Sequence, residues 1–474
     1  MFLLLLLLWK VLEDLHLLLS SSQAYVADVT LLTPPSVQLN NPTGVSISPN
    51  GLYALIADQG NHIIRQIILS TSTTSTLAGL SGSPGYSNGI GTNARFNLPK
   101  SIAISSDGQY AYIADYGNHM IRQIMISISL VSAIAGMKEI FGFSDGVGTF
   151  AMFYFPADVI ISYNRSFALV ADRSNHLVRK ILISNHQVRS LVGRSGVSGN
   201  SNGIGSNAKF NNPESVCLSP DDSLAFVADY SNHLIRRIIL STNEVTVFVG
   251  GDSFGSSNGY GTHARFYYPS GVEITMDGLY AFVSDRYNHL IRQILISTRL
   301  VSTIAGMSEV SGASNGIGTN AQFTYPNDLS VSFDGRFAVI ADSSNNMIRS
   351  LQMLDNPTSQ PTSSPSLYPT PKPSTRPSSQ PSMIPTLVSE NLQRQYSIFP
   401  SGSSLTETLI LIFVALFIVV GFSYGIYRKY FRRRLSPRYD DSDSEHPLYK
   451  PEQGIQMSMS PVEYSIVPNM SESP

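Results

Sequence analysis

Short apolar stretches alternate with polar residues in a regular way along roughly the first three quarters of this chain. In the first period, one stretch lies at residues 45–47, a second ends at Asp58, a third follows His62, and a fourth closes at Gly79. Alternation with a period of two predicts β-strands, and Asn50-Gly51 is a typical turn between two of them. Each period is therefore expected to form a small sheet of four strands.

One motif marks the period and occurs six times. Each copy has an Asp at a strand end, an Asn three residues later, a His after that Asn, and an Arg on the next strand, and the sixth copy has Asn in place of His. Successive copies are 57, 57, 57, 56 and 57 residues apart, which indicates a true repeat. The motif residues are Asp58, Asn61, His62, Arg65; Asp115, Asn118, His119, Arg122; Asp172, Asn175, His176, Arg179; Asp229, Asn232, His233, Arg236; Asp285, Asn288, His289, Arg292; and Asp342, Asn345, Asn346, Arg349.

Six such sheets predict one architecture. A single four-stranded sheet cannot bury both of its faces, whereas six sheets packed radially around an axis bury them against one another. We therefore predict an all-β fold, a six-bladed β-propeller within residues 25–354. Only one strand follows the last motif, so the sixth blade lacks an outer strand. Residues 26–33 precede the first repeated proline at the right distance, and we predict that they complete this blade and close the ring.

These residues resemble a known family of propellers. The triplet Asn-His-Leu stands at residues 175–177, 232–234 and 288–290, and the linking pattern Gly-x-Gly-x-x-Ala-x-Phe recurs at 89–96 and 203–210. With Pro-x-Gly-Val and the Ala-Asp strand end in the same order, the region from about residue 40 to 352 resembles the NHL-repeat family. The resemblance implies a propeller scaffold, and the family includes a peptidyl-hydroxyglycine lyase domain and cytosolic RNA-binding proteins.

The two ends of the chain carry longer apolar segments. We interpret residues 1–24 as a signal peptide, because an apolar run precedes small residues at a cleavage position. Charged residues interrupt that run, so a misassigned start codon and a poor membrane anchor are the alternatives. Residues 405–427 are predicted to form a transmembrane helix, since their uncharged part is long enough to cross about 30 Å of hydrocarbon. A buried core helix is the alternative, although neither flank offers a globular domain.

The segments beside this helix predict its orientation. Residues 355–404 are rich in Pro, Ser and Thr, with a proline at every fourth position from 357 to 385, which favours a semi-rigid, disordered stalk. Five basic residues follow the helix within residues 428–434 and place the disordered tail, 428–474, in the cytoplasm. The chain is thus expected to be a single-pass type I protein of the plasma membrane or an endomembrane.

Composition excludes some classes of function. A formal net charge of −2 provides no broad basic field, so nucleic acid is not an expected partner. The one cysteine, Cys217, excludes an intrachain disulfide. We interpret it as a buried apolar side chain, with a reactive or intermolecular thiol as the alternative.

The repeated motif residues are interpreted as scaffold because they recur in every blade. The Asp is expected to accept backbone N–H groups in a tight turn, and the Arg to pair with a carboxylate of the same or an adjacent blade. The histidines lie in turns outside the innermost strands, at a radius of about 10 Å, whereas zinc needs donors within about 2.1 Å of one ion. No metal is therefore expected at His62, His119, His176, His233 and His289.

Function is expected where the blades differ, directly after the proline that opens each innermost strand. Four charged residues occur at these positions, on the face of the Asn-His turns. They are expected to converge on a polar ligand or a calcium ion at the mouth of the channel. The alternative is that they are solvated charges in a water-filled channel. The candidate ligand-binding residues are Lys100, Asp158, Glu214 and Asp328.

Two short motifs suggest further contacts. Asn164-Arg165-Ser166 is a glycosylation triplet in a predicted turn and requires an external N-terminus. Tyr464, followed by Ser465-Ile466-Val467, matches a sorting signal that recruits a cytoplasmic adaptor, although such short patterns also arise by chance.

Three functions compete. We predict a non-enzymatic cell-surface receptor or adhesion protein whose propeller binds an extracellular protein or glycan and needs no cofactor. The alternative is an enzyme resembling peptidyl-hydroxyglycine lyase, although within the predicted propeller only His263 and His186 lie outside the repeated histidine position. The third is an RNA-binding module, which the predicted topology and the near-neutral charge disfavour.

Overall fold

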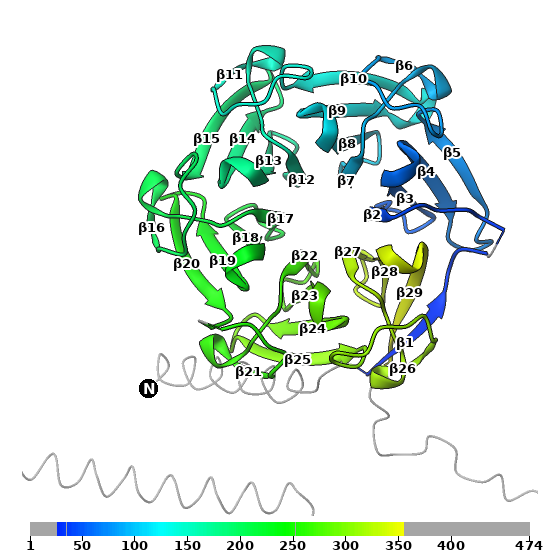
Figure 1. The fold of residues 1–474 in the computed structure, drawn as a ribbon, viewed down its shortest axis with the longest axis vertical. Helices are drawn as coiled ribbons and strands as arrows, with labels where there is room; N and C mark the ends of the chain where they lie inside the picture. The colour runs from blue at the N-terminus through cyan, green and yellow to red at the C-terminus, as the bar shows by residue number, and fades with distance from the viewer. Residues whose placement is uncertain (1–25, 35, 252, 355–474) are drawn as a thin grey trace, which may run out of the picture. The chain divides into compact units, whose positions relative to one another are not determined.

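The computed structural model describes residues 26–34, 36–251 and 253–354, all within the first of two compact units of the chain, Met1–Leu367. These residues form six antiparallel sheets around a central axis (Figure 1), which confirms the all-β, six-bladed propeller. Within this part of the chain no helix is long and apolar enough to cross a bilayer. The predicted signal peptide, stalk, transmembrane helix and tail, residues 1–24, 355–404, 405–427 and 428–474, lie outside the described residues.

Each blade contains four main strands, which we call the innermost, second, third and outermost strand in order from the axis. The innermost strands are β2 (Pro42–Ile47), β7 (Pro99–Ile104), β12 (Pro156–Ile161), β17 (Pro213–Leu218), β22 (Pro269–Ile274) and β27 (Pro326–Val331). The second strands are β3 (Tyr53–Asp58), β8 (Tyr110–Asp115), β13 (Phe167–Asp172), β18 (Leu224–Asp229), β23 (Tyr280–Asp285) and β28 (Phe337–Asp342).

The outer half of each blade follows the motif turn. The third strands are β4 (Ile63–Ile68), β9 (Met120–Met125), β14 (Leu177–Leu182), β19 (Leu234–Ile239), β24 (Leu290–Leu295) and β29 (Met347–Leu354). The outermost strands are β5 (Thr74–Ala78), β10 (Leu130–Ala135), β15 (Gln187–Gly193), β20 (Glu244–Val249), β25 (Leu300–Ala305) and β1 (Val26–Leu31).

The segments that link the blades add a short fifth strand, which the sequence analysis did not predict. In five of the six sheets a two-residue strand pairs with the outermost strand, and a short 3-10 turn follows it. These strands are β6 (Gly89–Ile90), β11 (Gly146–Val147), β16 (Gly203–Ile204), β21 (Gly259–Tyr260) and β26 (Gly316–Ile317), and the turns after them are η2 (Gly91–Asn93), η5 (Gly148–Phe150), η7 (Gly205–Asn207), η9 (Gly261–His263) and η11 (Gly318–Asn320).

The ring is closed by the N-terminal strand, as predicted. Strand β1 lies antiparallel to β29 over its full length, with Val29 opposite Leu351, and also pairs with β26. In Figure 1 this blue strand lies among the yellow strands of the sixth blade. Ala27 and Val29 are buried in the apolar cluster between the fifth and sixth blades. The first and last segments of the propeller therefore belong to one sheet.

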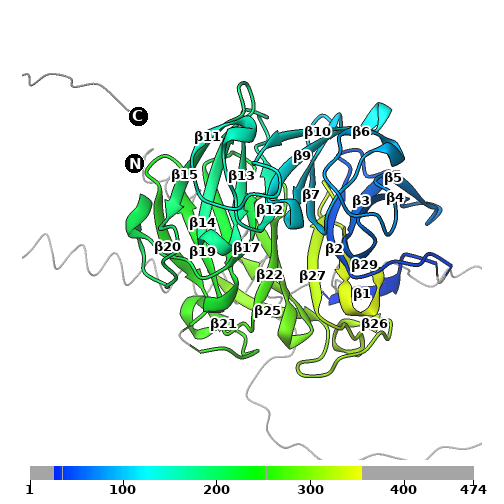
Figure 2. The ribbon, with the colours of Figure 1, turned by 45° about the horizontal axis from the view of Figure 1, so that its top comes forward.

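The core consists of apolar layers between neighbouring blades, whose innermost strands stand side by side around the axis (Figure 2). Between the fourth and fifth blades, Phe226 and Ile235 pack with Val272 and Ile294 of the next sheet. Phe266, from the segment that links the two blades, is fully buried in the same cluster. Burial of one such aromatic side chain stabilises the fold by roughly 2–3 kcal/mol.

The motif Asp and Arg hold each linking segment against its blade. In the fourth blade, Asp229 accepts hydrogen bonds from Asn232 at 2.8 Å and from Arg236 at 2.9 Å, and both charged side chains are fully buried. The carboxylate also accepts the backbone N–H of Asn211, which lies 18 residues earlier and not in the tight turn that we expected. The Arg236 guanidinium lies 5.4 Å above the ring of Phe210. The Arg thus pairs within its own blade, as one of the two predicted alternatives has it.

The motif His joins neighbouring blades. It follows a 3-10 turn and adopts the left-handed conformation, with φ of 60° at His233. Its Nδ1 accepts the backbone N–H of Tyr268 in the next blade at 3.1 Å. The other four motif histidines make the equivalent bond, and in the sixth blade the side chain of Asn346 accepts the N–H of Asn41 at 2.7 Å. The six turns are η1 (Gln59–Asn61), η3 (Tyr116–Asn118), η6 (Arg173–Asn175), η8 (Tyr230–Asn232), η10 (Arg286–Asn288) and η12 (Ser343–Asn345).

Candidate ligand-binding face

We call the side of the propeller that carries these six turns the His-turn face, and the end of the channel on this side the mouth. Each innermost strand begins here with its proline and shifts register immediately afterwards, between Pro156 and Asp158 in β12. Such a bulge places two successive residues opposite one on the partner strand, so the two residues that follow the proline can both reach the channel. The space that remains at the mouth is about 10 Å³, roughly enough for one water molecule.

All four predicted candidates line the mouth together with small polar residues. Lys100 Nζ lies 2.7 Å from one carboxylate oxygen of Glu214, and Arg173 Nε lies 2.7 Å from the other. The side chain of Glu214 is only 3% exposed. Lys100 and Glu214 come from the second and fourth blades, so their ion pair bridges the mouth and narrows it.

The electrostatics of the mouth are dominated by positive charge. Burial alone would raise the pKa of Glu214, but Lys100 and Arg173 outweigh it and hold the pKa at about 2. Burial lowers the pKa of Lys100, Glu214 opposes this shift, and the positive charge of Arg286 adds to it. Glu214 is therefore ionised over the whole physiological pH range.

Sequence reasoning missed a second ring of residues at the mouth, at the position directly after each motif Asp. Tyr116, Arg173, Tyr230 and Arg286 occupy it in the second to fifth blades, so Tyr and Arg alternate. Arg286 Nη1 lies 3.5 Å from the hydroxyl of Tyr230. Large unequal residues beside an invariant Asp are the signal that could have revealed this ring.

An aromatic arm runs from the rim of the His-turn face to this ring. Phe141 stacks on Tyr154 with ring centroids 4.5 Å apart, Tyr154 on Phe155 at 5.1 Å, and Phe155 on Tyr116 at 4.6 Å. The ammonium of Lys100 lies 5.3 Å from the centre of the Tyr116 ring. At its outer end Phe141 is 59% exposed. The arm therefore connects solvent to the cations of the mouth.

A second aromatic arm occupies the equivalent positions two blades further on. Phe254 stacks on Tyr267 at 4.5 Å, Tyr267 on Tyr268 at 5.1 Å, and Tyr268 contacts Tyr230 at 4.7 Å. Arg173 lies 5.8 Å from the centre of the Tyr230 ring, and Phe254 is 60% exposed. The two arms approach the mouth from different blades, with Arg173 between their inner ends.

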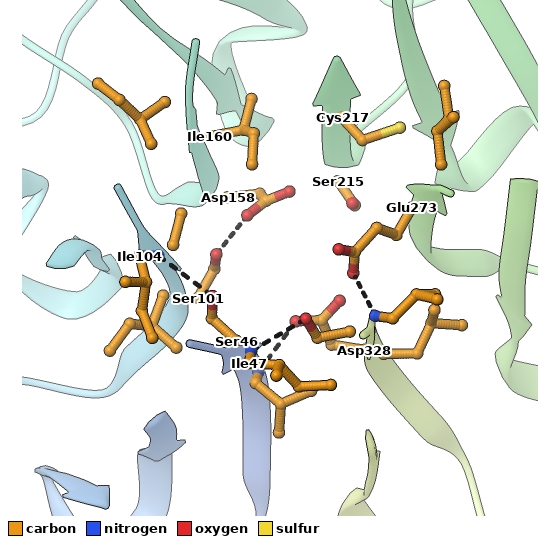
Figure 3. A pocket seen from close by; sticks show the side chains of 18 of the residues that line it. Ser46, Ile47, Ser101, Ile104, Asp158, Ile160, Ser215, Cys217, Glu273 and Asp328 are labelled. Carbon is orange, nitrogen blue, oxygen red and sulfur yellow. Dashed lines mark hydrogen bonds between the residues drawn. The ribbon is translucent and has the colours of Figure 1, made fainter. Parts of the chain in front are cut away.

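Beyond the mouth, the channel widens into a cavity of about 160 Å³. Figure 3 shows that Asp158, Glu273 and Asp328 point into it. Sequence analysis singled out the two aspartates but not Glu273, which lies two residues further along its innermost strand than the aspartates do on theirs. Cys217 also lines the cavity; it is buried and burial raises the pKa of its thiol, as an apolar role predicts.

The three carboxyl groups occupy the open inner edges of the blades. An innermost strand has no further strand to pair with, so its inward N–H groups need other acceptors. Each carboxyl accepts one such N–H from the next blade: Asp158 from Val216 at 2.8 Å, Glu273 from Val331 at 3.2 Å, and Asp328 from Val45 at 3.1 Å.

Burial strongly affects the charge of these groups. Burial and then the negative charge of Asp158 raise the pKa of Asp328 to about 8. Burial also raises the pKa of Asp158, and burial together with Asp328 raises the pKa of Glu273. Asp328 is therefore protonated at neutral pH, which makes it a poor calcium ligand, and Glu214 is already held by two cations. Across the described residues no group of three or more His, Cys, Asp or Glu side chains is arranged to hold a metal.

The two histidines outside the repeated position lie away from the mouth. His263 ends the linking turn η9, and its ring lies 3.2 Å from the backbone oxygen of Tyr260. His186 lies between β14 and β15, with φ of 56°. Asn164 is exposed in the turn between β12 and β13, and its glycosylation stays a prediction. Tyr464 lies outside the described residues.

Comparisons with known proteins support the repeat. Residues 100–121 match the LVIVD repeat family model. NHL repeat-containing protein 2 from Gallus gallus and from Homo sapiens is 26% identical over 352 residues, covering 68% of this chain and 47% of each relative. The chain therefore spans about half the length of these curated relatives.

Solved structures share the fold. A protein of unknown function from Bacteroides thetaiotaomicron aligns with a TM-score of 0.54 at 18% identity, covering 69% of this chain and 76% of that chain. An auxiliary nutrient binding protein from the same organism aligns with a TM-score of 0.52 at 14% identity and the same coverage. At such identities the likeness concerns the propeller fold alone.

Proposed function

Because this chain belongs to the NHL-repeat β-propeller family, in which repeated residues form the scaffold, we propose that the propeller is a binding module whose His-turn face takes a protein ligand. The observation that carries the proposal is the pair of aromatic arms that run from exposed Phe141 and Phe254 to the cations of the mouth. Tyrosine, phenylalanine and arginine are enriched in the energetic centres of protein interfaces.

The role that we propose is that of a cell-surface receptor or adhesion protein without catalytic activity. This part rests on the predicted signal peptide, stalk and transmembrane helix. A glycan is the alternative ligand, and a lyase-like enzyme is the alternative function. The repeated Asp, Arg and His are engaged in the hydrogen bonds that hold the blades together, which leaves the unequal residues of the mouth and the arms to contact a ligand.

The test displays the full-length chain on intact cells and labels neighbouring proteins with a membrane-impermeant reagent. Phe141→Ser together with Phe254→Ser should abolish the labelling of specific partners, because it removes both exposed ends of the arms. The matched control is Phe150→Ser with Tyr260→Ser, since these side chains are also exposed, at 76% and 60%, but belong to η5 and β21 beside the outermost strands.

Equal loss with the control pair would contradict the proposed face. Loss of labelling after removal of cell-surface glycans, with no protein partner retained, would favour the glycan alternative. Absence of the wild-type chain from the cell surface would contradict the receptor role.

A further inference from the structure

The mouth of the channel carries more positive than negative charge. Lys100, Arg173 and Arg286 meet there, and both oxygens of Glu214 are already used by the first two. Within the described residues Arg286 forms no ion pair. Its closest recorded polar contact is the Tyr230 hydroxyl at 3.5 Å, and its Nε is buried without a hydrogen-bond partner. Arg286 is half-buried, and a buried Nε–H without an acceptor is costly in the free protein, while Glu214 attracts the guanidinium only without direct contact.

The carboxyls deeper in the channel compensate for this charge only in part, because the negative charge of Asp158 helps to keep Asp328 protonated at neutral pH. Asp158 and Asp328 lie at the inner wall of the mouth, but burial raises the pKa of both, to about 8 for Asp328. Both accept backbone N–H groups from the innermost strand of the next blade, so these oxygens already take part in hydrogen bonds between blades. The positive charge of the mouth is thus directed toward the His-turn face.

The shape of the mouth limits which groups can neutralise its positive charge. The space among its lining residues is only about 10 Å³, so a ligand cannot enter the channel and must place an anionic group over it. The planar fork of an Arg side chain matches a carboxylate, with which it forms two parallel hydrogen bonds. Tyr116 and Tyr230, the inner ends of the two aromatic arms, flank this position.

We infer that Arg286, with Lys100 and Arg173, forms a seat for a carboxylate group of a peptide segment bound on the His-turn face. The inference rests on the proposed function, because it specifies what the ligand of that face presents at the mouth. The segment places an Asp or Glu side chain, or a chain terminus, over the channel and apolar groups along the aromatic arms.

The seat predicts that one substitution affects binding and stability differently. Arg286→Gln removes the attraction for a ligand carboxylate, and in the free protein it removes both the repulsion between Arg286 and Lys100 and the attraction between Arg286 and Glu214. The variant should therefore bind acidic peptides at least about tenfold more weakly. Its melting temperature without a ligand should stay close to that of the wild type, because the lost repulsion and the lost attraction oppose each other. A residue with a purely structural role would lower the melting temperature instead.

The experiment measures peptide binding to the purified full-length protein by calorimetry. The probes are the capped peptides Tyr-Glu-Tyr and Tyr-Gln-Tyr, free sulfate, and a uronate-bearing oligosaccharide. The Glu peptide should bind at least about fivefold more tightly than the Gln peptide, and added salt should weaken it. Arg286→Lys should retain part of the affinity, because it keeps the charge but loses the fork. Arg189→Gln is the matched control, since Arg189 is exposed on β15.

Several results would overturn the seat. These are equal binding of the two peptides, equal loss in the Arg286 and Arg189 variants, and a lower melting temperature for Arg286→Gln. Binding of sulfate or the uronate oligosaccharide without the Glu peptide would overturn the assignment to a peptide. If Phe141→Ser with Phe254→Ser abolishes binding while Arg286→Gln does not, the proposed face stands without the seat. If Arg286→Gln abolishes binding while the two Phe substitutions do not, the seat stands without the aromatic arms.

Discussion

At the scale of single residues, one position in each blade combines an unusual backbone conformation with a contact between blades. The motif His adopts positive φ and accepts a backbone N–H through Nδ1, as His176 does from Asn212 at 3.1 Å. Asn346 has the same conformation and the same kind of bond in the sixth blade. The position thus requires a side-chain acceptor that tolerates the left-handed region, and does not require an imidazole.

We therefore expect His176→Asn to lower the stability of the fold only slightly and His176→Ala to lower it strongly. Asparagine keeps both the acceptor and the backbone preference, so the free energy of unfolding should fall by less than about 1 kcal/mol. Alanine leaves the N–H of Asn212 without its partner and strains the backbone, and should lower it by about 2 kcal/mol. Chemical denaturation of the two variants checks the difference, and equal destabilisation would contradict it.

At the scale of elements, the closing strand β1 determines whether the ring is complete. It covers the edge of β29, and Ala27 and Val29 fill the apolar layer against the fifth blade. Thr33, just beyond the strand, accepts the backbone N–H of Ile348 at 3.1 Å. Without β1, the edge of β29 and part of the apolar core between the fifth and sixth blades would face water.

Deletion of residues 25–36 should therefore lower the melting temperature by roughly 10 °C or more, because several kcal/mol of packing and strand pairing are lost. Calorimetry of the full-length chain with and without this segment measures the effect. A chain that lacks only residues 1–24 serves as the control and should melt like the wild type. An unchanged transition after the longer deletion would mean that β1 does not latch the ring.

At the scale of the whole molecule, the buried carboxyls of the channel link stability to pH. The folded pKa of Asp328, about 8, lies above its ordinary unfolded value near 3.9. Between these values the folded chain holds a proton that the unfolded chain has released, so stability falls as the pH rises toward 8. Glu273 acts in the same direction. Burial lowers the pKa of the motif histidines, so they make stability rise with pH until, above about pH 7.5, they are neutral in both states.

The free energy of unfolding should therefore decrease from about pH 7.5 to pH 8.5, where the histidines no longer titrate, by up to about 1.4 kcal/mol per pH unit for each carboxyl. Asp328→Asn keeps an acceptor for the N–H of Val45 but cannot titrate, so its pH dependence should be shallower. Urea denaturation at several pH values in this range checks both statements. Parallel curves for wild type and variant would assign the linkage to other groups.

The sequence by itself determined the blades, their number and the closing strand. These features depend on alternation, turn residues and a repeat length, all of which are local or can be counted along the chain. The contacts among the residues at the mouth needed the tertiary structure. Glu214 meets Lys100, 114 residues earlier, only because the curvature of the ring brings the second and fourth blades together. Within the described part of the chain, Arg286 forms no ion pair while both oxygens of Glu214 bind Lys100 and Arg173, and no spacing along the chain records that arrangement.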